Sequence, residues 1–182
     1  HGINEGQKEE VIEKKFKPLF GENLYNYLEN EIFSDIDNFY NQVLSKSFFE
    51  KNKLIIIKDA SDKIKNEIEV LKEKNLDDIK IILISNMLDK KSKLRNLFEK
   101  EKDLVSIAFY SDNNQTLSTI TKTFFSKKNI PISQESINLI VSRANGDRKN
   151  LNNELSKIEN FLTSKKKITI EEIYILTNLS EN

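Results

Sequence analysis

Two short apolar runs constrain the fold of this chain more than any other feature of its sequence. Leu54–Ile57 is apolar at every position, and Ile79–Ile84 forms a second run that is interrupted only by Lys80. Runs of this length are too short for stable helices, and strands that are buried on both faces of a parallel sheet have this pattern. Both runs are therefore predicted to be strands of a parallel sheet.

Helical patterns alternate with strand patterns up to residue 110. The most regular helical pattern follows Ser34, which we expect to be an N-cap. The expected elements are, in order, a helix over residues 5–17 that ends at Pro18 and Gly21, a strand at Leu24–Leu28, a helix from Ser34 to Leu44, the strand Leu54–Ile57, a helix from Ser61, the strand Ile79–Ile84, a helix over residues 90–100 and a strand at Leu104–Tyr110. This alternation is typical of βαβ units and predicts an α/β fold.

The pattern changes after residue 110, because only helical periods follow Asp112. Pro131 and Gly146 lie in the breaks between these helices, and Thr169–Glu172 has the pattern of a capping box. We therefore expect a boundary near residues 111–113, with an α/β domain over residues 1–112 and a small, all-helical lid domain over residues 113–182.

An α/β domain followed by a helical lid is the arrangement of AAA+ ATPases, which hold nucleotide with a P-loop of the form G-x-x-x-x-G-K-[ST]. The nearest segment here is Gly2–Glu9. Its glycines are one residue too close, Gln7 precedes Lys8, and Glu9 stands where a hydroxyl would hold magnesium. We interpret this segment as a degenerate nucleotide site and expect no cofactor.

Groups that could carry catalysis are few. The run Ile79–Ile84 ends in Ser85 and Asn86 rather than in an acid, and Asp59 follows the other run as a single carboxylate. The chain has no cysteine, and its only histidine is His1, so thiolate zinc sites and Cys–His or Ser–His pairs inside the fold are not expected. The prediction is that no residue is catalytic and that no metal is bound.

Composition limits the partners. The 29 basic residues balance the 29 acidic ones, so no bulk positive field draws the chain to nucleic acid. The absence of cysteine favours an intracellular location, and no apolar run approaches the roughly 20 residues of a membrane span. We expect a cytoplasmic protein without a membrane contact.

A local cluster of cations is the one candidate for phosphate contacts. Lys90, Lys91, Lys93 and Arg95 follow the run Ile79–Ile84, and a second basic run lies at residues 165–167. Such clusters position nucleic-acid backbones in some proteins. The alternative is a solvated helix face.

Adjacent aromatic residues provide a second candidate site. Phe48 and Phe49 follow the helix that ends near Leu44 and lie among polar residues such as Ser47. They either fold back onto the core of the chain or are offered to a partner, and the local sequence leaves both possibilities open.

Three segments together resemble the delta subunits of bacterial DNA polymerase III clamp loaders, in a similarity of order and spacing that spans the whole chain. They are Leu44–Phe49 running into Lys53–Ile57, Ile81–Lys100, and Gly146–Ile158 with Ile168–Ile173. The resemblance implies an AAA+-like subunit that has lost nucleotide binding and that binds and opens the ring-shaped sliding clamp (the beta subunit). It also implies that Phe48 and Phe49, with Ser47 and Leu44 beside them, dock into a pocket of the clamp. Phe48 departs from the family pattern, which often has leucine there.

The same resemblance implies further partners and parts. The partners are the gamma/tau and delta prime subunits, which hydrolyse ATP, and DNA through the complex, which as a whole is a DNA-directed DNA polymerase and thus a nucleotidyltransferase. A strand before Gly2 and a C-terminal collar domain are also implied, and neither is in this sequence. Two other functions stay open, an active AAA+ ATPase with a truncated P-loop and a DNA-binding adaptor that uses Lys90–Arg95.

Overall fold

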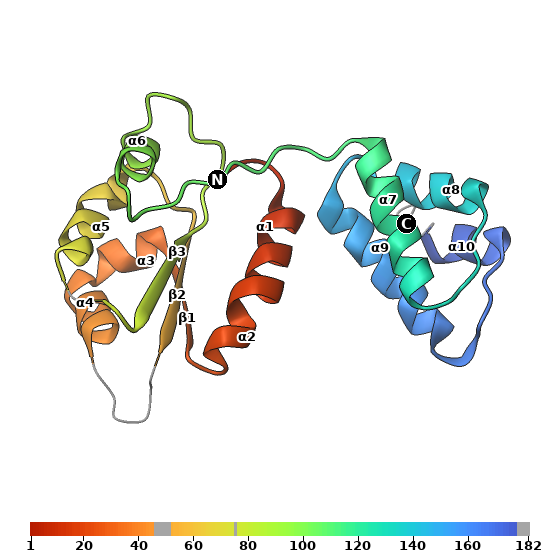
Figure 1. The fold of residues 1–182 in the computed structure, drawn as a ribbon, viewed down its shortest axis with the longest axis horizontal. Coiled ribbons are helices and arrows are strands. Elements are labelled where there is room, and N and C mark those ends of the chain that lie inside the picture. The colour runs from red at the N-terminus through yellow and green to blue at the C-terminus, as the bar shows by residue number, and fades with distance from the viewer. Residues whose placement is uncertain (46–51, 75, 178–182) are drawn as a thin grey trace. The chain divides into compact units, whose positions relative to one another are not determined.

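The computed structural model describes residues 1–45, 52–74 and 76–177 (Figure 1). The chain forms two compact units. The first consists of His1–Ile3 with Lys8–Phe109, and the second consists of Asn4–Gln7 with the chain from Tyr110 onward. The N-terminal segment therefore contributes residues to both units.

A parallel three-stranded sheet forms the centre of the first unit. Its strands are β1 (Leu24–Leu28), β2 (Lys53–Lys58) and β3 (Ile79–Leu83), and their order in the sheet is β1-β2-β3. All residues from Leu54 to Ile57 are buried, which confirms the prediction for the first apolar run. β3 is only half-buried, because it is paired with β2 on one side and is an edge strand of the sheet.

Helices cover both faces of this sheet (Figure 1). One face is covered by the continuous helical segment α1 (Glu5–Val11), η1 (Ile12–Phe16) and α2 (Lys17–Phe20). The other is covered by α3 (Glu29–Ser34), α4 (Ile36–Leu44), η2 (Asp62–Ile64), α5 (Lys65–Lys72) and α6 (Lys93–Lys100). Side chains of β2 alternate between the two cores: Leu54 and Ile56 pack toward the first, and Ile55 and Ile57 toward the second.

Two helix boundaries differ from the predicted ones. The first helical segment continues past Pro18 to Phe20, because Pro18 lies in the first turn of α2, directly after η1, and proline is tolerated in the first turn of an α-helix. Ser34 is the last residue of α3, so its prediction as an N-cap was wrong. The N-cap of α4 is Asp35, whose carboxylate accepts a hydrogen bond from the backbone nitrogen of Asn38 at 3.1 Å.

The strand predicted at Leu104–Tyr110 is absent from the described structure. The segment runs without regular structure, and its one β-bridge joins Phe109 to Gly2 in parallel orientation. The reason is the lack of a neighbouring strand, since a β-strand exists only through a partner.

All regular secondary structure among the described residues of the second unit is helical. Its elements are α7 (Asn114–Lys127), α8 (Gln134–Ala144), α9 (Arg148–Phe161), η3 (Leu162–Ser164) and α10 (Ile170–Thr177), and they enclose one apolar core. The predicted capping box is confirmed, because Thr169 and Glu172 exchange hydrogen bonds between side chains and backbone nitrogens. Among the described residues, no helix combines the length and the apolar character needed to span a membrane.

Candidate functional site

The degenerate phosphate turn lies where Gly2 passes Phe109. Gly2 has a φ of +127°, and a Cβ atom at this position would lie 2.1 Å from the carbonyl oxygen of Phe109. Its backbone nitrogen donates to Asn86 at 3.2 Å, just after β3. Glycine is therefore required here by the close passage of two backbones, and this requirement does not depend on a phosphate.

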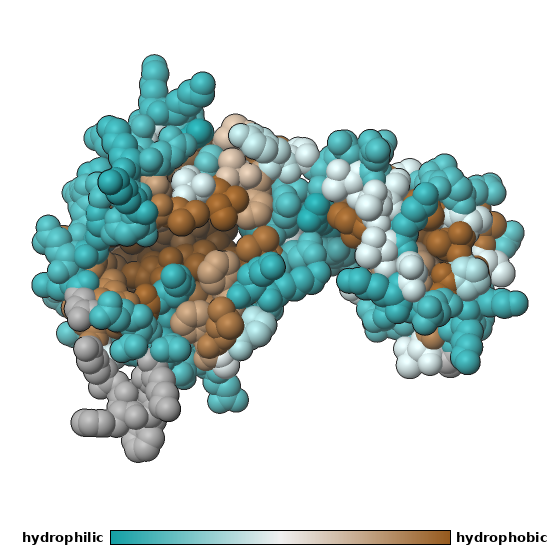
Figure 2. Space-filling view, in the orientation of Figure 1, coloured by the Kyte–Doolittle hydropathy of each residue, from teal (hydrophilic) through white to brown (hydrophobic). Residues whose placement is uncertain are grey.

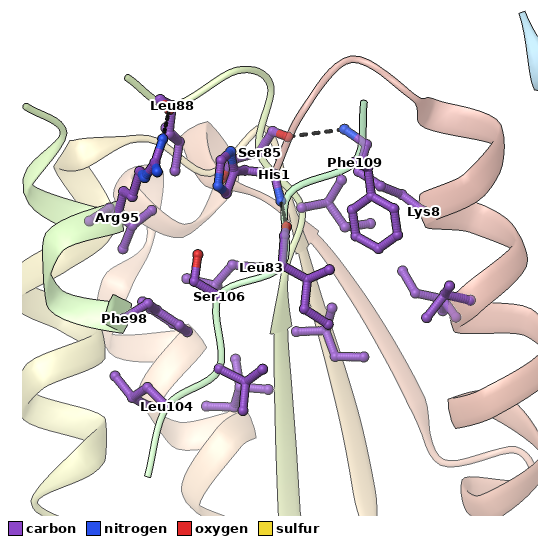
Figure 3. A pocket seen from close by; sticks show the side chains of 18 of the residues that line it. His1, Lys8, Leu83, Ser85, Leu88, Arg95, Phe98, Leu104, Ser106 and Phe109 are labelled. Atoms are coloured by element: carbon purple, nitrogen blue, oxygen red, sulfur yellow. Dashed lines mark hydrogen bonds between the residues drawn. The ribbon is translucent and has the colours of Figure 1, made fainter. Parts of the chain in front are cut away.

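The ammonium of Lys8, the cation of this turn, is bonded to main-chain carbonyl groups (Figure 3). Its side chain is buried, and Nζ donates to the carbonyl oxygen of Gly2 at 2.9 Å and to that of Ser85 at 3.0 Å. A P-loop lysine must reach the β- and γ-phosphates of the nucleotide. Here the ammonium instead donates to two main-chain carbonyl oxygens of this chain. Glu9, which takes the position of the magnesium-binding hydroxyl, is exposed.

A second arrangement of polar groups was missed by the sequence analysis and lies in the helical unit. Arg148, the first residue of α9, donates from Nε and Nη2 to the two carboxylate oxygens of Asp112, at 2.7 and 2.6 Å. Asn4 donates to the same carboxylate at 2.9 Å and to the carbonyl oxygen of Tyr110 at 2.9 Å. Gly6 lies close to the start of α9, and only glycine fits there because a Cβ atom would lie 2.5 Å from the backbone nitrogen of Lys149.

The Asp112 carboxylate is charged in this environment. Burial alone would raise the pKa of Asp112, but the hydrogen bonds from Arg148 and Asn4 and the charge of Arg148 outweigh burial and lower that pKa. The signal for this pair in the sequence is weak, because 36 residues separate its members and many other acids and cations could pair. The pair holds the N-terminal residues Asn4–Gln7 to the helical unit.

An apolar groove borders the free edge of β3 (Figures 2 and 3). Its volume is about 370 Å³, and it is bounded by η1, β3, α6 and the extended residues 103–107. Figure 2 shows apolar side chains gathered in this hollow, and Figure 3 shows Leu83, Phe98 and Leu104 along its walls. Such a lining suits an apolar group rather than a phosphate.

No described group of side chains has the character of a metal site. The described residues contain no cluster of three or more His, Asp or Glu side chains that could hold an ion. Asp59, the acid after β2, is exposed and adopts a left-handed backbone conformation with a φ of 55°.

Most of the predicted clamp contact falls outside the described residues. Ser47, Phe48 and Phe49 are not described, whereas Leu44, the last residue of α4, is 38% exposed. The flanking residues contact each other: Lys53, at the start of β2, donates from Nζ to the carbonyl oxygen of Ser45 at 2.7 Å. Both ends of the connection between α4 and β2 are therefore tied together.

The predicted phosphate-binding cluster is divided by the structure. Lys90, Lys91 and Lys93 are exposed around the start of α6. Arg95 is half-buried, donates to Glu99 at 2.7 Å and to the carbonyl oxygen of Leu88 at 3.1 Å, and lines the groove. Because the guanidinium of Arg95 is bonded to other groups of this chain, Lys90, Lys91 and Lys93 remain as the candidates for a phosphate contact.

Comparisons with known proteins give a consistent picture of the fold. No model of a protein family matches the sequence. A search of curated proteins also finds no match. Among solved structures, the Bacillus subtilis DNA clamp loader delta protein (YqeN) matches 96% of this chain at 15% identity, with a TM-score of 0.58. The Thermotoga maritima RuvB Holliday junction branch migration motor matches 98% at 12% identity, also with a TM-score of 0.58.

The chain spans 56% of the delta protein and 60% of RuvB, so it corresponds to little more than half of either structure. At these identities the likeness concerns the fold. The parallel sheet with helices on both faces, followed in the chain by a helical unit, confirms the predicted fold class and is the fold that this chain shares with these two structures.

Proposed function

We propose that this chain is a clamp-loader subunit of the delta type, which binds and opens a sliding clamp during DNA replication and leaves ATP hydrolysis to partner subunits. In this proposal, residues 1–112 act as the α/β domain that contacts the clamp, and residues 113–182 act as the lid domain. The fold likeness to a clamp loader delta protein supports the proposal, as does the sequence resemblance in the segments around Phe48, Ile81–Lys100 and Gly146–Ile158.

The observation that carries the non-catalytic part of the proposal is the position of Lys8. Its ammonium is buried and binds the carbonyl oxygens of Gly2 and Ser85, where an active P-loop would present it to phosphate. This argues against the alternative of an active AAA+ ATPase. Magnesium-dependent ATP binding with a submillimolar dissociation constant would restore that alternative.

The clamp contact is tested by replacing both Phe48 and Phe49 with alanine. Aromatic anchors in a partner's pocket typically contribute about 2 kcal/mol or more, and the contributions of neighbouring anchors are not additive, so we expect clamp affinity to fall by about 100-fold or more. The measurement is a titration of the cognate sliding clamp, with the partner subunits absent. Phe33→Ala is the matched control, because Phe33 is an exposed phenylalanine on α3 with 42% exposure and should leave clamp affinity unchanged.

Thermal unfolding of the same variants separates the two interpretations of the aromatic pair. If both residues serve the clamp, their replacement leaves the melting temperature nearly unchanged. If they belong to the core, each replacement costs roughly 3–5 kcal/mol of stability and the clamp affinity stays intact. The second result would reject the proposed contact.

The DNA-binding alternative rests on the exposed Lys90, Lys91 and Lys93. It predicts duplex binding that weakens steeply as the salt concentration rises. A chain that binds no duplex at low salt, or one that binds equally well after replacement of the three lysines by alanine, would remove this alternative.

A further inference from the structure

The connection between α8 and α9 contains an asparagine–glycine pair. Asn145 is the one asparagine of the sequence that is followed by glycine, Gly146. In such a pair the main-chain nitrogen of the glycine attacks the side-chain amide carbon of the asparagine and forms a cyclic succinimide, because no side chain restricts or shields that nitrogen. Whether a folded chain permits this reaction depends on the exposure of the two groups and on their hydrogen bonds.

Both reacting groups are open in this turn. Asn145 ends α8 in the left-handed conformation, and both Asn145 and Gly146 are exposed. No described group is hydrogen-bonded to the side-chain amide of Asn145 or to the backbone nitrogen of Gly146. A Cβ atom at Gly146 would meet nothing within 4 Å. The amide carbon and the attacking nitrogen are therefore accessible to water and to bases.

Ring closure requires a rotation of the backbone at Asn145. The ψ of 42° places the nitrogen of Gly146 opposite the Cβ atom of Asn145, and the reaction needs these two atoms on the same side. The turn is held by the backbone nitrogens of Asn145 and Asp147, which donate to Ser142 at 3.3 Å and to Ala144 at 2.9 Å. Exposed bonds of this kind break in local openings at a small cost in free energy. The reaction therefore proceeds from the opened turn.

Asn129 provides a matched comparison within the helical unit. It is exposed, lies just beyond the end of α7 and is also left-handed, with a φ of 55°. The next residue is Ile130, whose backbone nitrogen donates to the carbonyl oxygen of Phe125 at 3.0 Å and whose side chain packs against the apolar core. The nitrogen that would attack Asn129 is thus bonded and restricted, whereas that of Gly146 is neither.

We propose that Asn145 and Gly146 form a self-modifying turn, in which Asn145 converts through a succinimide to aspartate and isoaspartate. The nitrogen of Gly146 loses its proton to hydroxide and bonds to Cγ of Asn145. The bond between Cγ and Nδ2 breaks, and Nδ2 leaves as ammonia after it takes a proton from water. Water then opens the ring at Cγ, which leaves aspartate, or at the main-chain carbonyl carbon, which leaves isoaspartate.

The modification changes the helical unit and is independent of the proposed function. Isoaspartate carries the main chain through the former side chain, so it lengthens the connection between α8 and α9. Aspartate adds a negative charge at the C-terminal end of α8, where the helix dipole is already negative.

The test is peptide mapping by mass spectrometry after the whole chain has been incubated at mildly alkaline pH and physiological temperature. We expect Asn145 to convert at least about tenfold faster than Asn129, because the hydrogen bond of Ile130 must break before its nitrogen attacks. Both products should appear, and the rate should rise in proportion to the hydroxide concentration. Equal rates at the two asparagines, or aspartate without isoaspartate, would overturn the proposal.

Two controls assign the reaction to this turn. Asn145→Gly keeps a residue that favours the left-handed conformation and removes the reacting amide. A mass gain in the same peptide of this variant would assign the conversion to Asn150, Asn152 or Asn153 and overturn the proposal. A synthetic peptide of residues 141–149 should convert faster than the folded chain, because it needs no opening. Conversion in this peptide with none in the folded chain would show that the turn stays closed, and would also overturn the proposal.

Discussion

At the scale of single residues, Asp112 carries a charge in the helical unit that is bonded to both Arg148 and Asn4. Its side chain is 6% exposed and that of Arg148 is 10% exposed, so the two-bond contact between them is largely shielded from water. A buried pair of this kind adds little over two apolar residues, but the loss of one partner leaves the other charge buried and alone. The pair therefore fixes geometry more than it adds stability.

Replacement of Asp112 by asparagine should lower the free energy of unfolding near neutral pH by roughly 3–5 kcal/mol, because the guanidinium of Arg148 loses its counter-charge. The folded-state pKa of Asp112 lies below the ordinary value of 3.8. The stability from this group is thus complete above the unfolded-state pKa and is lost as the pH falls through the folded-state pKa.

The difference between the parent protein and Asp112→Asn should consequently shrink in acid. Urea unfolding at about pH 7 and about pH 3 measures this change. Asp59→Asn is the control, since Asp59 is exposed and asparagine readily adopts its left-handed backbone conformation. A difference for Asp112→Asn that stays constant over this range would contradict the assignment of its charge.

At the scale of elements, β2 and the helices were predictable from the sequence, whereas the segment 104–110 was not. An unbroken run such as Leu54–Ile57 has only one stable environment, between two layers of helices, and cap residues such as Thr169 act within four positions of the chain. Leu104–Tyr110 has the apolar residues of a strand, but strand formation depends on a partner that local sequence does not reveal. The contacts of Lys8 with Ser85 and of Asp112 with Arg148 were also not predictable, because their partners lie far away along the chain.

The groove beside β3 makes a prediction about strand addition. His1 already pairs with the segment 104–110. Its backbone nitrogen donates to the carbonyl oxygen of Ile107 at 2.8 Å, and its carbonyl oxygen accepts from the backbone nitrogen of Phe109 at 2.8 Å. A chain extended before His1 by about five valine and isoleucine residues should continue this pairing, fill the groove and raise the melting temperature by about 5 °C or more.

The control for strand addition is an extension of equal length with a central proline, which cannot donate to the sheet. A second control is Val105→Lys in the extended protein. Val105 lines the groove but is 74% exposed in the present chain, so this change should matter only when the groove is filled. Equal stabilisation by the valine–isoleucine and proline extensions would show that the groove does not accept a strand.

At the scale of the whole molecule, each of the two units has a core of its own. Ile57 is fully buried in the α/β unit, and Leu151 is fully buried in the helical unit. Separate cores allow separate unfolding transitions, which single domains rarely show. The fold class was predictable from the order of an α/β unit and a helical unit along the sequence, whereas function depends on side chains that vary between proteins of the same fold.

Core truncation should therefore affect one unit at a time. Ile57→Ala and Leu151→Ala should each cost about 2–5 kcal/mol, and amide exchange followed by mass spectrometry should show faster exchange mainly in the peptides of the unit that carries the substitution. Faster exchange in both units after either substitution would show that the chain unfolds as one cooperative body.

The alternation of β2 between two apolar cores has a consequence for how its alignment is encoded. Leu54, Ile55, Ile56 and Ile57 have similar volumes, so a shift of the strand by one residue would move most of these side chains into the opposite core at little cost in apolar contact. Such a shift would, however, carry either Ile57 to the exposed position of Lys58 or Lys58 into the buried position of Ile57. The alignment must then be encoded at the ends, where Lys53 is buried under α4 and Lys58 is exposed. In the central strand, the buried apolar residues stabilise the strand, and the flanking lysines determine its alignment.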